Sequence, residues 1–383
     1  MTKRVYLDNA ATTPMLGVVK NTMVKMMEEF GNASSLHFEG RRAQAVVEKA
    51  RAQVAALIGA QPQEIIFTSG GTEANNLLVG TFWGQRYVTS AIEHPSIHEP
   101  VMYSSGKGKR AHFLPVDSGG IVDIDALRDA LVFRPGVVSV MLANNEIGVV
   151  QNLNQIADLA HPAKARVHTD ATQAVGKIPV NVDALGVDYL TLSAHKIGGP
   201  QGVGALYVRE KSLLKPLLRG GSQELNRRAG TYNTAAIAGF GAAAVAALKT
   251  VDGFRDKVQP LTDKLKKGIV KNISNVVVNG DQKNCLPHIL NVSFAGAEGE
   301  SIMLALDEVG IAVSTGSACA TGDIRPSRVL TAINADPELA HSSIRFSLGA
   351  NTTAHDIDFV LTELPLIIER LRQMSTLKMR HSS

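Results

Sequence analysis

Cysteine is scarce in this chain, which has only Cys285 and Cys319 among its 383 residues. The two lie far apart, and neither belongs to a Cys-x-x-Cys pair. This spacing excludes a disulfide framework and a zinc ribbon, because both need several closely spaced cysteines. Sparing use of cysteine is typical of the reducing cytoplasm, where we expect the protein to work.

Long apolar runs and blocks of like charge are missing as well. No stretch approaches the roughly 18 consecutive apolar residues of a membrane span, and the N-terminal sequence MTKRVYLDNAATTP lacks the apolar core of a signal peptide. The formal net charge is only +4, and the Lys and Arg residues are scattered. We therefore expect neither a membrane nor a nucleic acid as a direct partner.

Short apolar runs alternate with helix-like segments through the first two thirds of the chain. The runs are rich in β-branched and aromatic residues and end in polar or glycine turns: EIIFT (64–68), RYVTS (86–90), VVSVMLA (137–143), RVHTD (166–170) and VDYLTLS (187–193). This alternation predicts an α/β fold with a mainly parallel sheet flanked by helices. We assign residues 14–255 to this large domain, and residues 1–13 with 256–383 to a smaller α+β domain.

Polar residues follow the predicted strands, at the edge where open sheets of this kind bind ligands. After the first strand, Gly70 and Gly71 open a turn, and Thr72 and Glu73 begin a helix. The free N–H groups of this turn and helix start, at Gly71 and Thr72, favour an anion such as phosphate. An ordinary strand-to-helix turn would have the same sequence. Asp170 ends another strand, where a helix-capping carboxylate is the alternative.

Lys196 is the most unusual of these strand-end residues, because it follows an apolar strand beside Ser193 and His195. Burial penalises the charged form of a lysine and so makes its amine nucleophilic. His94 and His98 stand four positions apart after another strand, but Pro95 intervenes and no acidic ligand is near. We expect no metal there, and a His94 ring packed flat on another ring.

Amides complete the set, with Asn145 after the run 137–143 and Gln173 one turn beyond Asp170. If these strand ends meet in one crevice, they offer phosphate anchors, a carboxylate, an imidazole and a desolvated lysine. Pyridoxal phosphate (PLP) needs this combination: a lysine for the Schiff base, an acid for the pyridine nitrogen and a cradle for the phosphate.

The chain resembles the cysteine desulfurases of the NifS/IscS type, in the class V aminotransferase superfamily. The resemblance runs nearly end to end and rests on motifs in family order: YLDNAATTP, GNASSLHFEGRRA, FTSGGTEANN, EHPSI, NNEIGVVQ, HTDATQAVGK, SAHKIGGPQGVGALYVR, RRAGT, STGSACATG and SSIRFSLG. It implies the PLP-dependent transferase fold of type I and a homodimer.

The resemblance also implies roles for single residues. Lys196 would form the Schiff base with the cofactor, Asp170 would pair with its pyridine nitrogen, and His94 would stack on its ring. Asn145 and Gln173 would lie near its phenolic oxygen. The phosphate would be bound by Gly71, Thr72, Ser193 and His195, and Thr231 would reach the phosphate of a neighbouring subunit. Arg345 would bind the substrate carboxylate with Asn145 nearby, although a structural arginine in a strand would look the same.

Cys319 distinguishes this prediction from an aminotransferase. It lies in STGSACATGD, a run of small residues suited to a mobile loop, and the resemblance makes it the sulfur-accepting nucleophile beside Lys196 and His94. A buried, hydrophobe-like cysteine is the alternative. Its loop resembles that of the long-loop group, whereas Cys285 lacks such a context and we assign it a structural role.

The implied reaction converts L-cysteine to L-alanine and leaves a persulfide on Cys319. The sulfur would pass to an acceptor protein, either an iron–sulfur scaffold or a thiolation enzyme. A selenocysteine lyase, a small-amino-acid aminotransferase and a non-catalytic scaffold of the same fold are the alternatives. The chain departs from the family at Ala194, Gly199 and Gln201, and its short end LRQMSTLKMRHSS leaves the acceptor open.

Overall fold

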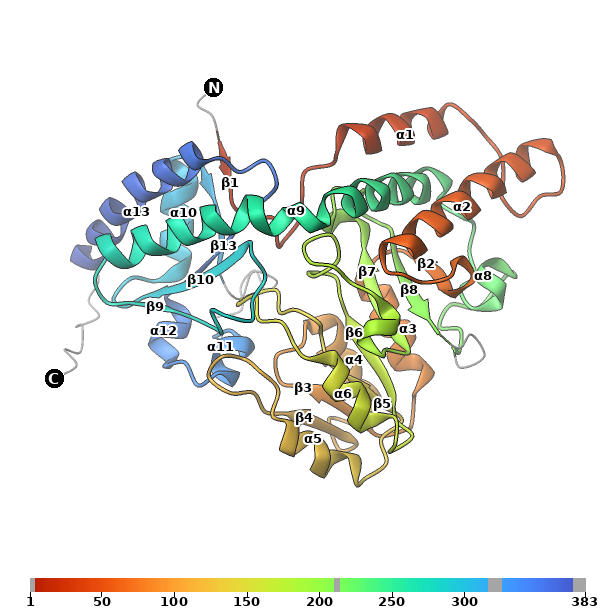
Figure 1. The fold of residues 1–383 in the computed structure, drawn as a ribbon, viewed down its shortest axis with the longest axis horizontal. Coiled ribbons are helices and arrows are strands. Elements are labelled where there is room, and N and C mark those ends of the chain that lie inside the picture. The colour runs from red at the N-terminus through yellow and green to blue at the C-terminus, as the bar shows by residue number, and fades with distance from the viewer. Residues whose placement is uncertain (1–3, 210–213, 316–325, 375–383) are drawn as a thin grey trace.

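The computed structural model describes residues 4–209, 214–315 and 326–374, and its ribbon forms two lobes (Figure 1). A seven-stranded sheet runs through the larger lobe in the order β2-β8-β7-β6-β5-β3-β4. Its strands are β2 (Ile65–Thr68), β3 (Tyr87–Ser90), β4 (Ala111–Leu114), β5 (Val137–Ser139), β6 (Arg166–Asp170), β7 (Tyr189–Ser193) and β8 (Gly204–Val208). The β2–β8 and β7–β8 pairs are antiparallel and the other four pairs are parallel, so the predicted mainly parallel sheet is confirmed.

Helices cover both faces of this sheet, and its central strands are therefore buried on both sides. The helical elements of this part are α1 (Gly17–Met27), α2 (Phe38–Leu57), η1 (Pro62–Glu64), α3 (Gly71–Thr81), α4 (Pro95–Ser104), α5 (Ile124–Leu131), α6 (Leu153–Ala160), α7 (Val182–Leu185), η2 (Ala194–Lys196) and α8 (Gln223–Asn226). One buried cluster includes residues of α2, α5 and α6, and another includes residues of α3 and α4.

The smaller lobe has an antiparallel sheet in the order β12-β13-β10-β9. Its strands are β9 (Val276–Val278), β10 (Ile289–Phe294), β12 (Ser314–Thr315) and β13 (Ser343–Ser347), and β1 (Val5–Tyr6) pairs beside them with β11 (Ile311–Ala312). The helices are α10 (Gly299–Glu308), α11 (Arg328–Ala332), α12 (Pro337–His341) and α13 (Ala354–Met374). Because β1 belongs here, the N-terminus returns to the C-terminal part of the chain.

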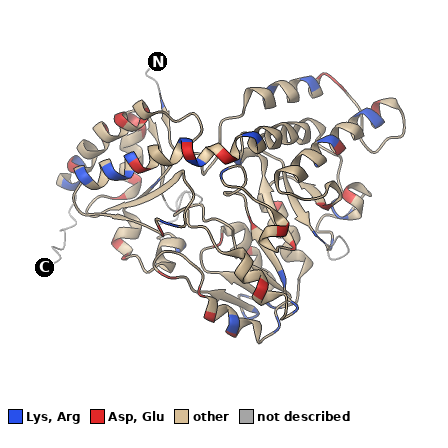
Figure 2. Cartoon of the chain, viewed as in Figure 1, with Lys and Arg blue, Asp and Glu red and all other residues tan. Residues whose placement is uncertain are grey.

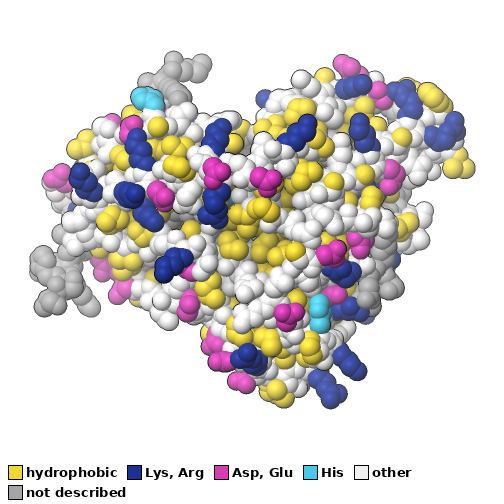
Figure 3. All heavy atoms as spheres, viewed as in Figure 1, with side chains coloured by type: hydrophobic (Ala, Val, Ile, Leu, Met, Phe, Trp, Pro, Cys, Tyr) yellow, Lys and Arg dark blue, Asp and Glu magenta, His cyan; other side chains and the backbone are white. Residues whose placement is uncertain are grey.

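Helix α9 (Thr234–Asn272) joins the lobes, which form one continuous surface with a notch between them in Figure 3. Its first half contributes to the core of the large lobe and its second half to that of the small lobe, so the boundary that we drew at residue 255 falls inside one helix. By length and composition alone α9 is apolar enough to cross a membrane, but 56% of its apolar 18-residue window is buried inside the protein.

Local details differ from the sequence prediction. The run 137–143 forms a strand only as far as Ser139, because the N–H of Met141 donates to Oε1 of the Glu93 side chain at 2.8 Å. Strand β4 was not predicted, since its sequence AHFL is short and only partly buried. Charges of both signs are interspersed along the helices (Figure 2), in keeping with the scattered Lys and Arg of the sequence.

Candidate active site

A cavity of about 290 Å³ lies beyond the carboxyl ends of β6 and β7. Its lining residues come from the turns after five strands, from the N-terminal segment and from β13: Ala10, Ala11, Gly71, Thr72, His94, Ser96, Met141, Ala143, Asn145, Asp170, Thr172, Gln173, Ser193, His195, Lys196 and Arg345. The structure thus brings together the predicted cofactor and substrate residues, with the exception of Thr231.

Lys196 ends the short helix η2, directly after β7. Its Nζ donates to the carbonyl oxygens of Ala10 and Ala11, the latter at 2.8 Å. Both acceptors are neutral backbone groups of the N-terminal segment, which lines the cavity at the carboxyl ends of the strands. The lysine is half-buried and lines the cavity.

Asp170 is the last residue of β6 and is buried. Its Oδ1 accepts from the N–H of Thr172 at 3.0 Å, which is the local capping bond that the sequence left open. Its Oδ2 accepts from Asn75 Nδ2 at 2.8 Å. Two donors from different elements fix the orientation of the carboxylate, as a partner of a pyridine nitrogen requires.

His94 is held in one tautomer by its neighbours. Its Nδ1 accepts from the N–H of Ser96 at 3.1 Å and lies 2.7 Å from Ser96 Oγ. That hydroxyl already accepts from Asn75 Nδ2 at 2.8 Å, so its own proton is directed to Nδ1. Burial lowers the pKa of His94, and the neutral ring carries its proton on Nε2.

The same Asn75 amide therefore joins two groups of the cavity. One of its hydrogens binds Ser96 and the other binds Asp170, so His94, Ser96, Asn75 and Asp170 form one chain of hydrogen bonds. Asn75 lies in α3 and Ser96 in α4. Neither was singled out from the sequence, although both lie in quoted motifs, FTSGGTEANN and EHPSI.

The N-terminus of α3 has the features of a phosphate cradle. Gly71 is its first residue, and a Cβ there would lie 3.4 Å from Thr172 Oγ1, inside the cavity. Glycine thus leaves the first N–H groups of the helix open to an anion. Burial lowers the pKa of His195 to about 4. Its ring is neutral at physiological pH, and Thr12 Oγ1 lies 3.1 Å from its Nδ1.

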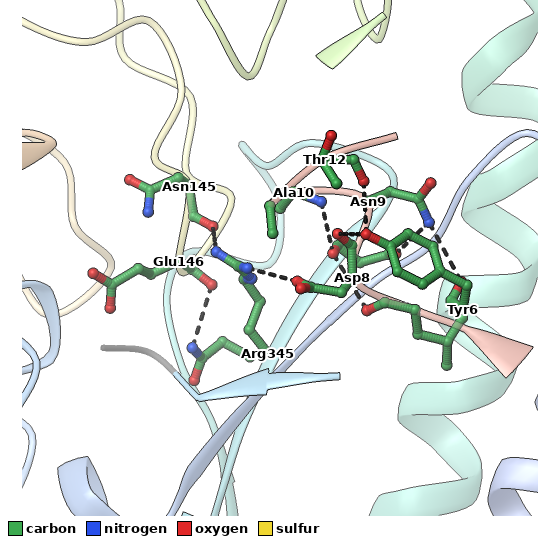
Figure 4. A network of polar contacts seen from close by, with 12 residues as sticks. Tyr6, Asp8, Asn9, Ala10, Thr12, Asn145, Glu146 and Arg345 are labelled. Carbon is green, nitrogen blue, oxygen red and sulfur yellow. Dashed lines mark hydrogen bonds and ion pairs between the residues drawn. The ribbon is translucent and has the colours of Figure 1, made fainter. Parts of the chain in front are cut away.

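Arg345 enters the cavity from β13 and is only 3% exposed. Its Nη2 donates to Asp8 Oδ1 at 2.8 Å and its Nη1 to the carbonyl oxygen of Asn145 at 3.0 Å (Figure 4). Its Nε has no hydrogen-bond partner among the residues that the structure describes. The guanidinium is therefore oriented by two acceptors and retains a buried donor for a further ligand.

The N-terminal segment is itself fixed to β13. Asn9 Nδ2 donates to the carbonyl oxygen of Ser347 at 2.9 Å, and Ala10 N donates to Ser347 Oγ at 2.9 Å. The Tyr6 hydroxyl contacts the carbonyl oxygens of Asp8 and Thr12 at 3.0 and 2.9 Å (Figure 4). These bonds place Ala10 and Ala11, which sequence reasoning did not select, against Lys196.

A buried polar atom without a partner tests whether PLP fits this cavity. The hydroxyl oxygen of Thr172 is buried, lines the cavity and has no hydrogen-bond partner among the described residues. Such an atom is costly unless a ligand pairs with it. Together with the lysine, the fixed carboxylate, the open helix N-terminus and a volume close to that of small cofactor sites, it makes the residue set fit the cofactor.

One predicted site residue that the structure describes does not line this cavity. Thr231 is exposed and does not line it, so a role at a neighbouring subunit's phosphate stays a prediction. Cys319 lies outside the described residues. Cys285 is partly buried, and burial raises the pKa of its thiol.

Within the described residues, no group of three or more His, Cys, Asp or Glu side chains could hold a metal ion. His98 does not join His94 in a ligand pair. Its Nδ1 lies 2.9 Å from Glu99 Oε1, and its ring packs at 5.2 Å from that of Phe113.

Comparison with known proteins identifies the class. The family model of the class-V aminotransferases matches residues 5–360, and the chain belongs to that family. Among its relatives, the cysteine desulfurase IscS of Dictyoglomus turgidum is 47% identical, over 99% of this chain and 98% of its own. The cysteine desulfurase NifS of Azotobacter vinelandii is 41% identical, over 97% and 94%. Within class V, the chain thus belongs with the cysteine desulfurases.

Solved structures agree with this assignment. A NifS-like protein superposes with a TM-score of 0.90 at 34% identity, covering 96% of this chain and all (100%) of its own. SspA in complex with cysteine superposes with a TM-score of 0.80 at 31% identity, covering 92% and 100%. The resemblance and the fold class expected from the sequence are confirmed.

Proposed function

We propose that this protein is a PLP-dependent cysteine desulfurase that converts L-cysteine to L-alanine and retains the sulfur as a persulfide. The observation that carries the proposal is the cavity in which Lys196, Asp170 and His94 converge beside Arg345. Membership of the cysteine desulfurases names the substrate, and the unpaired Thr172 hydroxyl with the open N-terminus of α3 supports the cofactor.

PLP, when bound, supplies a sink for the negative charge that develops at the substrate's Cα. Lys196 Nζ would hold the cofactor as a Schiff base and would take up the Cα proton once the substrate amine has replaced it. Asp170 would accept a hydrogen bond from the pyridine nitrogen, while the N–H groups of Gly71 and Thr72, with Ser193 and His195, would bind the phosphate.

Arg345 would bind the substrate, because its buried Nε, unpaired among the described residues, can donate to the carboxylate of L-cysteine. His94 would stack on the ring and present its Nε2 proton to the reacting groups. Cys319 is assigned as the nucleophile: its Sγ bonds to the sulfur of the substrate, and the C–S bond breaks with return of a proton to carbon. The balance is L-cysteine plus a thiol giving L-alanine plus a persulfide.

Three further assignments belong to this proposal. Thr231, exposed in a single chain, would complete the phosphate site of a second subunit in a homodimer. The persulfide sulfur would pass to an iron–sulfur scaffold or a thiolation enzyme. The near absence of cysteine favours the cytoplasm as the place of action.

Mass spectrometry of the holoenzyme after incubation with L-cysteine tests the function. One added sulfur should be found on the peptide that contains Cys319 and should disappear in Cys319→Ala, which should still be yellow and still change its absorption with L-cysteine. Cys285→Ala is the matched control and should behave like the parent. Release of alanine by Cys319→Ala at the parental rate would show that the persulfide mechanism is wrong.

A further inference from the structure

A second and larger cavity, of about 840 Å³, lies where the two lobes join. Its walls are the N-terminal segment, the middle of α9 and the segments that follow β6 and β13. Figure 3 shows apolar side chains exposed where α9 crosses between the lobes, with charged side chains of both signs beside them. The mechanism described above uses none of this cavity.

The N-terminal segment separates the two cavities. Ala10 and Ala11 line the catalytic cavity, whereas Asn9 and Thr13 line the second one. The separating segment is held firmly, because Thr13 Oγ1 donates to the carbonyl oxygen of His195 at 2.7 Å and accepts from the N–H of Gly198 at 2.8 Å. A molecule in the second cavity would therefore not occupy the position of the substrate.

Lys177 is the cation that stands inside this second cavity. It follows β6, lines the cavity and is half-buried, and its Nζ lies 4.9 Å from the centre of the Phe254 ring. No carboxylate among the described residues forms an ion pair with it. Burial penalises the charged form and lowers the pKa of Lys177 to about 8.

The remaining charges of the cavity do not supply that counter-ion. Lys249 and Lys257 also line it, and within the described part of the chain neither forms an ion pair. Arg4 is paired with Asp307. The acidic residue of the lining is Asp356, whose Oδ2 already accepts from Thr353 N and Oγ1 at 2.9 and 2.8 Å.

The rest of the wall is largely apolar. Leu16, Val18 and Ile197 contribute aliphatic side chains, and Phe254 contributes its ring. An ammonium at an apolar wall is unfavourable in the empty cavity and becomes favourable when an anion pairs with it. The cavity therefore matches a ligand that has one negative group and a hydrocarbon body.

We propose that this cavity is a second binding site, for a small organic carboxylate whose head pairs with Lys177 and whose hydrocarbon body packs on Leu16, Ile197 and Phe254. The site is separate from that of L-cysteine, and the proposal does not depend on the reaction assigned above. It depends only on the cavity, the uncompensated cation and the apolar wall.

Octanoate is a suitable probe, titrated into the folded holoenzyme by calorimetry. Saturable binding is expected, and n-octanol, with the same body and no charge, should bind at least about tenfold more weakly. Lys177→Met keeps the length of the side chain and removes its charge, and should weaken octanoate binding by a similar factor. Lys271→Met, at the exposed end of α9 and outside the lining, is the matched control and should bind like the parent.

Three results would overturn the proposal. The first is absence of saturable octanoate binding in the parent. The second is equal affinity in the parent and in a Lys177→Met variant that is folded and turns over L-cysteine normally. The third is displacement of octanoate by excess L-cysteine, which would place octanoate in the catalytic cavity. Octanoate affinity that is unchanged by excess L-cysteine supports the second site.

Discussion

The chain of hydrogen bonds behind His94 predicts what Ser96 contributes to catalysis. Ser96→Ala removes the hydroxyl that lies 2.7 Å from His94 Nδ1 and leaves the backbone N–H of residue 96 in place. The lost bond stabilised the neutral ring and was worth about 1 kcal/mol, which corresponds to roughly fivefold in the protonation equilibrium of the imidazole. The pKa of His94, now lowered by burial, should therefore rise.

The same substitution has a second, structural effect. Asn75 Nδ2 loses its acceptor at 2.8 Å while remaining buried, and an unpaired buried donor costs about 1–3 kcal/mol of stability. Since the other hydrogen of this amide binds Asp170, the carboxylate loses part of the support that orients it. Ser96→Ala should thus lower both the unfolding free energy and kcat.

The pH dependence of alanine release separates these two effects. In Ser96→Ala the acidic limb of the kcat profile should move to higher pH, while KM for L-cysteine stays near the parental value. Ring-nitrogen NMR should show the Nε2-protonated tautomer in the parent and a mixture in the variant. Ser96→Thr retains the hydroxyl and should restore the profile. A folded Ser96→Ala enzyme with an unmoved acidic limb would refute the reasoning.

Arg345→Ala should raise KM for L-cysteine by about 30-fold or more, because losing a charge-assisted pair costs on the order of 2–5 kcal/mol. Bound cofactor, followed by its absorption, should persist, and an unchanged KM would place the carboxylate site elsewhere. Burial raises the pKa of Glu93 from 4.5 to about 8. Between these two pH values the Glu93 side chain keeps its proton in the folded protein and has lost it in the unfolded chain. The contribution of Glu93 to the free energy of unfolding is therefore lost as pH rises from about 4.5 through 8. Urea unfolding at pH 5 and pH 8 should therefore show Glu93→Gln gaining stability relative to the parent at the higher pH; a difference independent of pH would contradict this.

The strand-end residues could be predicted because of a general property of parallel sheets. Strands that run the same way end at the same edge, so Gly71, Asp170 and Lys196 had to lie near one another once their strands were recognised. The family motifs then supplied chemical roles that spacing alone left open. The ends of single elements were predicted less well, such as the end of the strand at Ser139.

Other features depended on contacts between distant parts of the chain. The carbonyl oxygens of Ala10 and Ala11 reach Lys196 only because β1 and the residues after it pair with the C-terminal strands. No local sequence pattern predicts that Arg345 pairs with Asp8, which is 337 positions away.

The sequence by itself determined the class of fold and the edge of the sheet where the chemistry lies, because periodicity and strand direction are local properties. The tertiary structure alone decided the tautomer of His94, through donors brought from α3 and α4. It also decided that Lys177 stands in a cavity where no described carboxylate pairs with it, since burial and pairing are properties of the packed chain.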